Sequence, residues 1–225
     1  MANLIFDYDG TIHRSMLTYA PAFRATCKWL SDNGYIPEKE YSDGEISRWL
    51  GFNSTDMWGS FQPELDPEIR ETARIMLGED MARRIENGEG ALFPHAEDVL
   101  TKLKEQGHNL IFLSNCRVKY MQRHSRVFGL DRFFDSFYCC EEYGFIPKYE
   151  IFRHINDRYG GPFIVIGDRF HDIETAVRNG LSSIGCGYGY SEGDELKDAD
   201  IIVKDITEIP GAVEELLSRD ITSRS

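Results

Sequence analysis

The stretch Leu4–Thr11 reads LIFDYDGT and decides how the rest of the chain is interpreted. Its apolar start predicts a short strand, which is followed by two carboxylates, Asp7 and Asp9. Alternate side chains of an extended chain share a face, so both carboxylates leave the strand on the same side. Two like charges held this close favour a cation or a proton between them. A strand that ends in an Asx-rich turn at Gly10 is the alternative interpretation.

The composition is that of a globular protein with an acidic balance. Of 225 residues, 41% are hydrophobic, and 25 Lys and Arg stand against 38 Asp and Glu. The net charge of −13 repels a phosphate backbone, so we expect no nucleic-acid partner. No apolar stretch reaches the roughly 18 residues that span a bilayer, and no leader-like segment starts the chain, so no membrane partner is expected. Five cysteines without a Cys-x-x-Cys pair favour a cytoplasmic location over a disulfide framework or a zinc site.

Apolar runs that predict strands alternate with amphipathic segments in the second half of the chain. Further strands are expected over residues 109–113, 163–166, 183–186 and 201–203. Helices are expected over 94–106, over a segment with Ile173, Ala176 and Val177 on one face, and over 209–217. A frayed polar tail is expected from Ser218. This alternation predicts an α/β fold, a Rossmann-like parallel sheet covered by helices on both faces.

Residues 15–90 lack strand-like runs and are rich in helix and turn signals. Asp66-Pro67 predicts the N-cap and first turn of a helix that runs toward Ile85. We therefore expect a helical domain over 15–90, inserted after the first strand, and a sheet domain made of 1–14 and 91–225. The tryptophans of the inserted segment are expected in its core. They are Trp29, Trp49 and Trp58.

Polar side chains follow several of the predicted strands where those strands end. Because ligands of an open parallel sheet bind outside the carboxyl ends of its strands, these side chains are expected to share one edge. The set offers a carboxylate nucleophile, oxygen ligands for magnesium, a lysine for phosphate charge and a second carboxylate for proton transfer. It therefore suits phosphoryl transfer. Its members are Asp7, Asp9, Ser114, Asn115, Lys148, Asp168 and Asp172.

The chain resembles the haloacid dehalogenase superfamily, most closely its phosphoglycolate-phosphatase-like members with a helical cap after the first motif. The motifs that carry the resemblance are Asp7–Thr11, Leu113–Asn115, Lys148 and Gly167–Asp172. The resemblance spans nearly the whole chain. It implies a magnesium-dependent phosphatase that hydrolyses a small phosphorylated metabolite, phosphoglycolate-like or a sugar phosphate, through an aspartyl-phosphate.

The resemblance also implies a role for each motif residue. Asp7 would be the nucleophile and Asp9 the general acid and base. Magnesium would be held by Asp7, the carbonyl of Asp9 and Asp168, with Asp172 near the metal and Lys148. The residues that would bind the substrate phosphate are Thr11, Ser114, Asn115 and Lys148.

Three of these assignments have alternatives. Lys119 is a rival to Lys148, because relatives usually carry a proline shortly after this lysine, whereas here Pro147 precedes it. Ser114 also suits a helix cap. Asp172 also suits the first turn of a helix, where the helix dipole favours an acid.

Four further residues are candidates for substrate contact. His13 and Arg14 replace the small pair that often follows the first motif in relatives, and Arg48 and Asn53 flank the turn 50–52 of the inserted segment. The alternative functions are a phosphomutase of the same superfamily and a non-enzymatic phosphoacceptor or regulatory protein. The expected partner is a small phosphomonoester, and the expected assembly is a monomer or homodimer.

Overall fold

Six parallel strands form one sheet in the order β3-β2-β1-β4-β5-β6. The computed structural model describes residues 1–223, with side chains as far as Arg219. The strands are β1 (Asn3–Phe6), β2 (Asn109–Ser114), β3 (Ser136–Cys139), β4 (Phe163–Gly167), β5 (Ser182–Cys186) and β6 (Ile201–Val203). β1 lies between β2 and β4, with Phe6 in register with both Phe112 and Ile166. The predicted α/β class with a parallel sheet is confirmed.

Helices cover both faces of the sheet because successive strand residues face opposite sides. Leu4 and Phe6 belong to a buried cluster that includes apolar residues of α5 and α9. Ile5 belongs to the opposite cluster, with residues of α7 and α8. The helices of this part are α5 (Ala96–Glu105), α6 (Val118–Phe128), α7 (Lys148–Arg158), α8 (Phe170–Asn179) and α9 (Ile209–Ser223). Short 3-10 helices are η1 (Leu130–Arg132), η2 (Cys140–Tyr143) and η3 (Ile206–Glu208).

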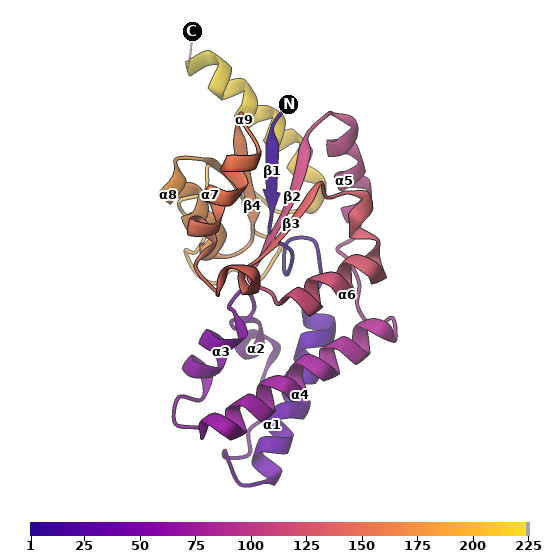
Figure 1. The fold of residues 1–225 in the computed structure, drawn as a ribbon, viewed down its shortest axis with the longest axis vertical. Helices are drawn as coiled ribbons and strands as arrows, with labels where there is room; N and C mark the ends of the chain where they lie inside the picture. The colour runs from indigo at the N-terminus through magenta and orange to yellow at the C-terminus, as the bar shows by residue number, and fades with distance from the viewer. Residues whose placement is uncertain (224–225) are drawn as a thin grey trace.

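Four helices between β1 and α5 form a second layer beyond the carboxyl ends of the strands (Figure 1). They are α1 (Met16–Asp32), α2 (Asp43–Ser47), α3 (Ser54–Phe61) and α4 (Pro67–Glu86), and we call this layer the cap. It has its own buried cluster, in which Trp58 is fully buried, while Trp29 and Trp49 are half-buried against it. The chain leaves and re-enters the sheet layer side by side, since Arg14 N donates to Ala91 O at 2.9 Å.

The structure corrects three expectations about individual elements. β3 was not predicted, because the apolar run in Ser136–Cys139 is only three residues long and is recognised as a strand by its pairing with β2. Val177 is 59% exposed, so its predicted place on the buried face of α8 is wrong. α9 continues beyond the predicted start of the tail at Ser218 as far as Ser223, and residues 224–225 of that tail lie outside the described residues. Among the described residues, none of the helices is long and apolar enough to cross a membrane.

Candidate active site

Three carboxylates from two strand ends form a buried cluster. Asp7 follows β1 directly, and its backbone N–H donates to Ile166 O at 2.8 Å. Asp168 follows β4, and Asp172 lies in the first turn of α8. One oxygen from each of the three carboxylates lies within 4.8 Å of the others, and each residue is at most 4% exposed. The strand ends therefore bring together carboxylates that are more than 160 positions apart in sequence.

Lys148 is the cation of this cluster. It begins α7, its side chain is buried, and its Nζ lies 2.6 Å from Asp7 Oδ1 and 2.7 Å from Asp172 Oδ1. Lys119, the alternative lysine, is exposed on α6 at the edge of a neighbouring cavity. Of the two lysines, Lys148 is therefore the one that the fold places against Asp7.

The cluster has more negative than positive charge. Burial, followed by repulsion from Asp172, raises the pKa of Asp7 from 3.8 to about 7, although Lys148 opposes the shift. Burial and the charges of Asp7 and Asp172 also raise the pKa of Asp168 well above its ordinary value. Magnesium prefers carboxylate oxygens, and a divalent cation would offset this repulsion. The donor set therefore fits the predicted metal.

Asp168 is held by its neighbours at the turn after β1. Thr11 Oγ1 donates to Asp168 Oδ1 at 3.3 Å, and Tyr190 N donates to Oδ2 at 2.7 Å. Gly10 has a φ of +87°, and a Cβ there would overlap the Asp168 carboxylate, so glycine is required for this close approach. Thr11 is fully buried and bonded to Asp168, which differs from its predicted contact with the substrate phosphate.

Asp9 is anchored through one of its two oxygens. Asp9 Oδ1 accepts hydrogen bonds from Ser15 Oγ at 2.6 Å, Tyr120 Oη at 2.6 Å and His13 Nδ1 at 3.0 Å. Among the side chains described, which extend as far as Arg219, none donates a hydrogen bond to Asp9 Oδ2. Burial favours a raised pKa of Asp9, but the hydrogen bond and charge of His13 hold it below its ordinary value. Asp9 is therefore a carboxylate with one fixed and one available oxygen.

Two of the residues that hold Asp9 were not predicted, and one was predicted for another role. Ser15 and Tyr120 carry no motif that marks them, and Tyr120 comes from α6, 111 positions away. His13 was a candidate for substrate contact, but it is fully buried beneath Asp9 and outside the cavity lining described below. His13 therefore positions Asp9 instead.

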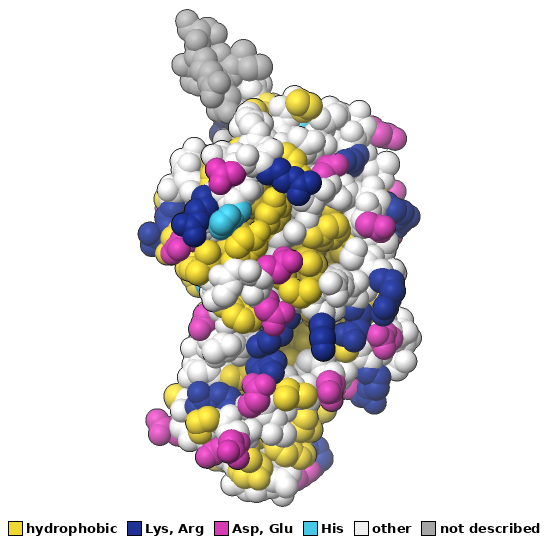
Figure 2. Space-filling view, in the orientation of Figure 1, with side chains coloured by type: hydrophobic (Ala, Val, Ile, Leu, Met, Phe, Trp, Pro, Cys, Tyr) yellow, Lys and Arg dark blue, Asp and Glu magenta, His cyan; other side chains and the backbone are white. Residues whose placement is uncertain are grey.

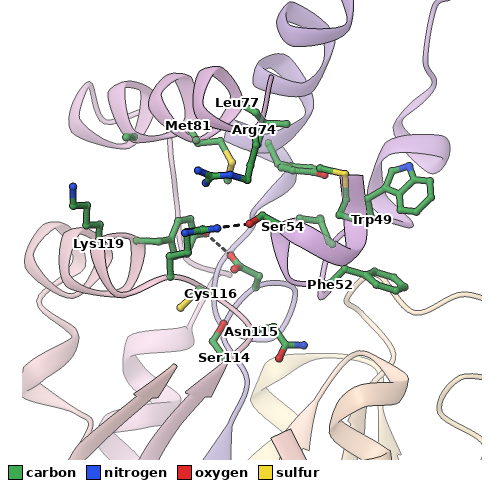
Figure 3. A pocket seen from close by; sticks show the side chains of 18 of the residues that line it. Trp49, Phe52, Ser54, Arg74, Leu77, Met81, Ser114, Asn115, Cys116 and Lys119 are labelled. Carbon is green, nitrogen blue, oxygen red and sulfur yellow. Dashed lines mark hydrogen bonds between the residues drawn. The ribbon is translucent and has the colours of Figure 1, made fainter. Parts of the chain in front are cut away.

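A cavity of about 430 Å³ lies between the sheet edge and the cap. Asp7, Asp9 and Ser114 line it from the sheet side, and Ser114 is 3% exposed. Figure 3 shows Leu77 and Met81 of α4 on the far wall, across from Ser114 and Cys116. Lys and Arg side chains, interspersed with Asp and Glu, gather on the surface where the cap meets the sheet layer (Figure 2). A ligand in this cavity would therefore lie between the carboxylates and the cap.

The other predicted substrate contacts are placed differently. Asn115 lines the cavity, but its Nδ2 donates to Gly51 O of the cap at 2.7 Å. Asn53 is the N-cap of α3 and accepts hydrogen bonds from backbone N–H groups of that helix. Arg14 and Arg48 are exposed and lie outside the cavity lining of the described chain.

The cap turn 47–54, which joins α2 to α3, is held on the sheet layer by three side chains. Arg169 is 2% exposed, and its guanidinium donates to the carbonyls of Ser47, Arg48 and Leu50 while pairing with Glu195 at 2.8 Å. Asn115 binds the turn at Gly51, and Arg117 Nε donates to Ser54 Oγ at 3.3 Å (Figure 3). Arg169 lies in a predicted motif, but no role was predicted for it.

Comparisons with known proteins give consistent matches. A family model described as haloacid dehalogenase-like hydrolase matches residues 1–180. A 5′-nucleotidase from Pseudomonas aeruginosa is 34% identical over 87% of this chain and 86% of its own. A phosphoglycolate phosphatase from Aliivibrio fischeri is 25% identical over 87% of this chain and 88% of its own. A crystal structure described as a predicted phosphatase from Clostridium acetobutylicum has the same fold. Its TM-score is 0.79 at 21% identity, over 95% of this chain and 98% of that one.

Proposed function

Because the chain belongs to the haloacid dehalogenase-like hydrolase family, we propose that it is a magnesium-dependent phosphatase that forms an aspartyl-phosphate on Asp7. The substrate is a small phosphorylated metabolite. The observation that carries the proposal is the position of Asp7, which lies at the cavity, is bonded to buried Lys148 and shares a carboxylate cluster with Asp168. A nucleophile, a cation and a metal-binding set meet there at one sheet edge.

In the first step, an oxygen of Asp7 attacks phosphorus, and the bond from phosphorus to the leaving-group oxygen breaks. Asp9, through Oδ2, gives a proton to that oxygen. In the second step Asp9 takes a proton from water, and the water oxygen attacks phosphorus and releases Asp7. Lys148 stabilises the negative charge on Asp7 and on the transferred phosphoryl group. Magnesium, when bound by Asp7, the Asp9 carbonyl and Asp168, supplies further charge stabilisation.

The network around Asp9 sets the protonation that this cycle needs. Hydrogen bonds hold the pKa of Asp9 low in the ligand-free protein, so Asp9 is ready for the base step as a carboxylate. The acid step needs a proton on Asp9, which the arrival of a phosphate dianion favours because a like charge raises the pKa of a carboxyl group. Ser15 and Tyr120 keep Oδ1 fixed in both steps.

The test is a phosphate-release screen of the purified protein with magnesium, run beside Asp7→Asn. The panel contains phosphoglycolate, sugar phosphates and nucleoside 5′-monophosphates, since the relatives are named for the first and the last of these classes. We expect release by the native protein and at least a thousandfold loss in Asp7→Asn. Normal turnover by Asp7→Asn would remove Asp7 as the nucleophile. Phosphate that moves within a sugar without release would indicate a mutase, and a long-lived aspartyl-phosphate without turnover would indicate a phosphoacceptor.

A further inference from the structure

Two cysteines that follow neighbouring strands lie side by side on the sheet side of the cavity. Cys116 follows β2 and lines the cavity close to Ser114 (Figure 3), whereas Cys139 ends β3 and is fully buried. The Cys116 thiol donates a hydrogen bond to the sulfur of Cys139, and this bond lowers the pKa of Cys139. The two sulfurs are therefore in contact, and one of them can be reached from the cavity.

The segments that carry the two cysteines are already joined on both sides of the pair. Three links connect them: the register pair Ser114–Cys139, the hydrogen bond from Cys140 Sγ to Asn115 Oδ1 at 2.7 Å, and the ion pair Arg117–Glu141 at 2.8 Å. A disulfide forms only where the backbone already holds two cysteines close together. A bond between Cys116 and Cys139 would cross two segments that meet this condition.

The pair also differs from the remaining cysteines in how readily a thiolate forms. The thiolate is the reactive form of cysteine. Besides its contact with Cys116, Cys139 Sγ lies 3.4 Å from Glu142 Oε2, which can accept its proton. In the three other cysteines burial raises the pKa of the thiol. They are Cys27, Cys140 and Cys186.

We propose that Cys116 and Cys139 are a redox-active dithiol that hydrogen peroxide, entering through the cavity, oxidises to a disulfide, and that this modification regulates the phosphatase. The regulatory part rests on the proposed function, whereas the reaction of the two thiols does not depend on it. Disulfides of proteins in reducing compartments are mostly of this transient, redox-sensing kind.

The reaction has two steps. In the first, the sulfur of Cys116 attacks one oxygen of the peroxide, the O–O bond breaks, and the leaving hydroxide takes the thiol proton to become water, so that Cys116 becomes a sulfenic acid. In the second, the sulfur of Cys139 attacks the sulfur of Cys116, and the S–O bond breaks. The hydroxide that leaves takes up the proton of Cys139, which makes a second water. Each sulfur gives up one electron, and the peroxide takes up both.

The disulfide would act on the cap through the two neighbours of Cys116. Asn115 binds the cap turn at Gly51, and Arg117 binds it at Ser54. Bond formation shortens the distance between the sulfurs from contact distance to about 2.05 Å, which draws Cys116 toward β3. Because a misplacement of about 1 Å can cost about a hundredfold in rate, we expect oxidation to lower phosphate release.

The decisive measurement is made on the native protein and needs no variant. The protein is treated with hydrogen peroxide, the excess is removed with catalase, and free thiols are counted in denaturant beside peptide mapping without reductant. We expect the loss of two of the five free thiols and a linked peptide that contains Cys116 and Cys139, both reversed by dithiothreitol. A link between other cysteines, or no link at all, would overturn the proposal.

Two variants test the order of the steps. Cys139→Ser lacks the second thiol, so the sulfenic acid should persist on Cys116 and react there with dimedone. Cys27→Ser is the matched control, since it removes a buried thiol from the cap cluster, and it should still form the Cys116–Cys139 link. Dimedone on another cysteine of Cys139→Ser would contradict the first step. If Cys139→Ser does not fold, the linked peptide of the native protein still decides whether the disulfide forms.

Activity is measured on the same oxidised and re-reduced samples. Phosphate release with magnesium should fall at least about tenfold on oxidation and recover with dithiothreitol. A disulfide that leaves phosphate release unchanged would overturn the regulatory part. If the reduced protein releases phosphate from no compound of the panel, the proposed function fails instead, while the thiol count still tests the dithiol, so the two failures are distinguishable.

Discussion

The carboxylate cluster should make the metal-free protein less stable as pH rises. Asp7 has a pKa raised from 3.8 to about 7, first by burial and then by Asp172. Between these two pH values the folded protein holds a proton that the unfolded chain has lost. The stabilisation that is present below pH 3.8 is therefore lost as pH rises through the folded-state pKa. Asp7→Asn removes the ionisable group and should remove this loss.

The magnitude follows from the difference between the two pKa values. At about 1.4 kcal/mol for each tenfold change in an acid constant, the loss approaches about 4 kcal/mol at pH 8, of which about 3 kcal/mol develops above pH 5. Asparagine keeps an oxygen that can accept the hydrogen bond from Lys148. We expect metal-free Asp7→Asn to be more stable than the native protein by about 3–4 kcal/mol at pH 8 and by less than about 2 kcal/mol at pH 5.

The measurement is the free energy of unfolding by urea in EDTA at pH 5 and pH 8. Asp157→Asn is the matched control, because it removes one negative charge from an exposed position, and it should change stability by less than about 0.5 kcal/mol at both pH values. Added magnesium should stabilise the native protein more than Asp7→Asn. Two results would contradict this reasoning: Asp7→Asn is less stable than the native protein at pH 8, or its free energy of unfolding rises by the same amount at both pH values. Either result would show that the carboxylates do not repel one another, and the argument for a cation would fail.

Three further changes separate the contributions around the site. Lys148→Met leaves two buried carboxylates without their cation and should lower the free energy of unfolding in urea by about 3–5 kcal/mol; a loss below 1 kcal/mol would contradict the pairing. Tyr120→Phe removes a hydroxyl that bonds the Asp9 carboxylate, and it should lower kcat about tenfold and the free energy of unfolding by about 1–3 kcal/mol. An unchanged kcat would show that Asp9 does not depend on it. Arg169→Leu should speed hydrogen exchange of the cap turn 47–54 at least tenfold. The exposed control Arg178→Leu should leave the hydrogen-exchange rates of turn 47–54 unchanged. Unchanged exchange in Arg169→Leu would show that Arg169 does not hold the turn on the sheet layer.

The sequence predicted the parts of this protein that depend on short-range pattern. The run Leu4–Phe6 and the apolar runs at β2 and β4 predicted a parallel sheet, because residues buried on both faces are continuously apolar. The family and the enzyme class, a phosphoric monoester hydrolase, were also predicted from the motifs and are confirmed by the comparisons. β3 was missed because its apolar run is too short to predict a strand without the neighbouring strand that pairs with it.

The candidate site was predictable where strand ends set it and unpredictable where packing sets it. Asp7, Asp168 and Lys148 meet because parallel strands end at one edge. The hydrogen bond from Tyr120 to Asp9 depends on how α6 docks against β1, and the residue pattern carries no information about that distance. Thr11 stood in a recognised motif, yet the tight turn at Gly10 directs it to Asp168.

The adjacency of Asp168 and Arg169 has a thermodynamic consequence. One peptide unit joins a carboxylate of the acidic cluster to the residue whose guanidinium holds the cap turn, so the two sites are covalent neighbours. Binding events at two such sites share a coupling free energy, and this coupling is reciprocal. If a cation raises the affinity for a ligand under the cap by some factor, the ligand must raise the affinity for the cation by the same factor. Titrating the cation with and without the ligand, and the ligand with and without the cation, should therefore give the same coupling free energy.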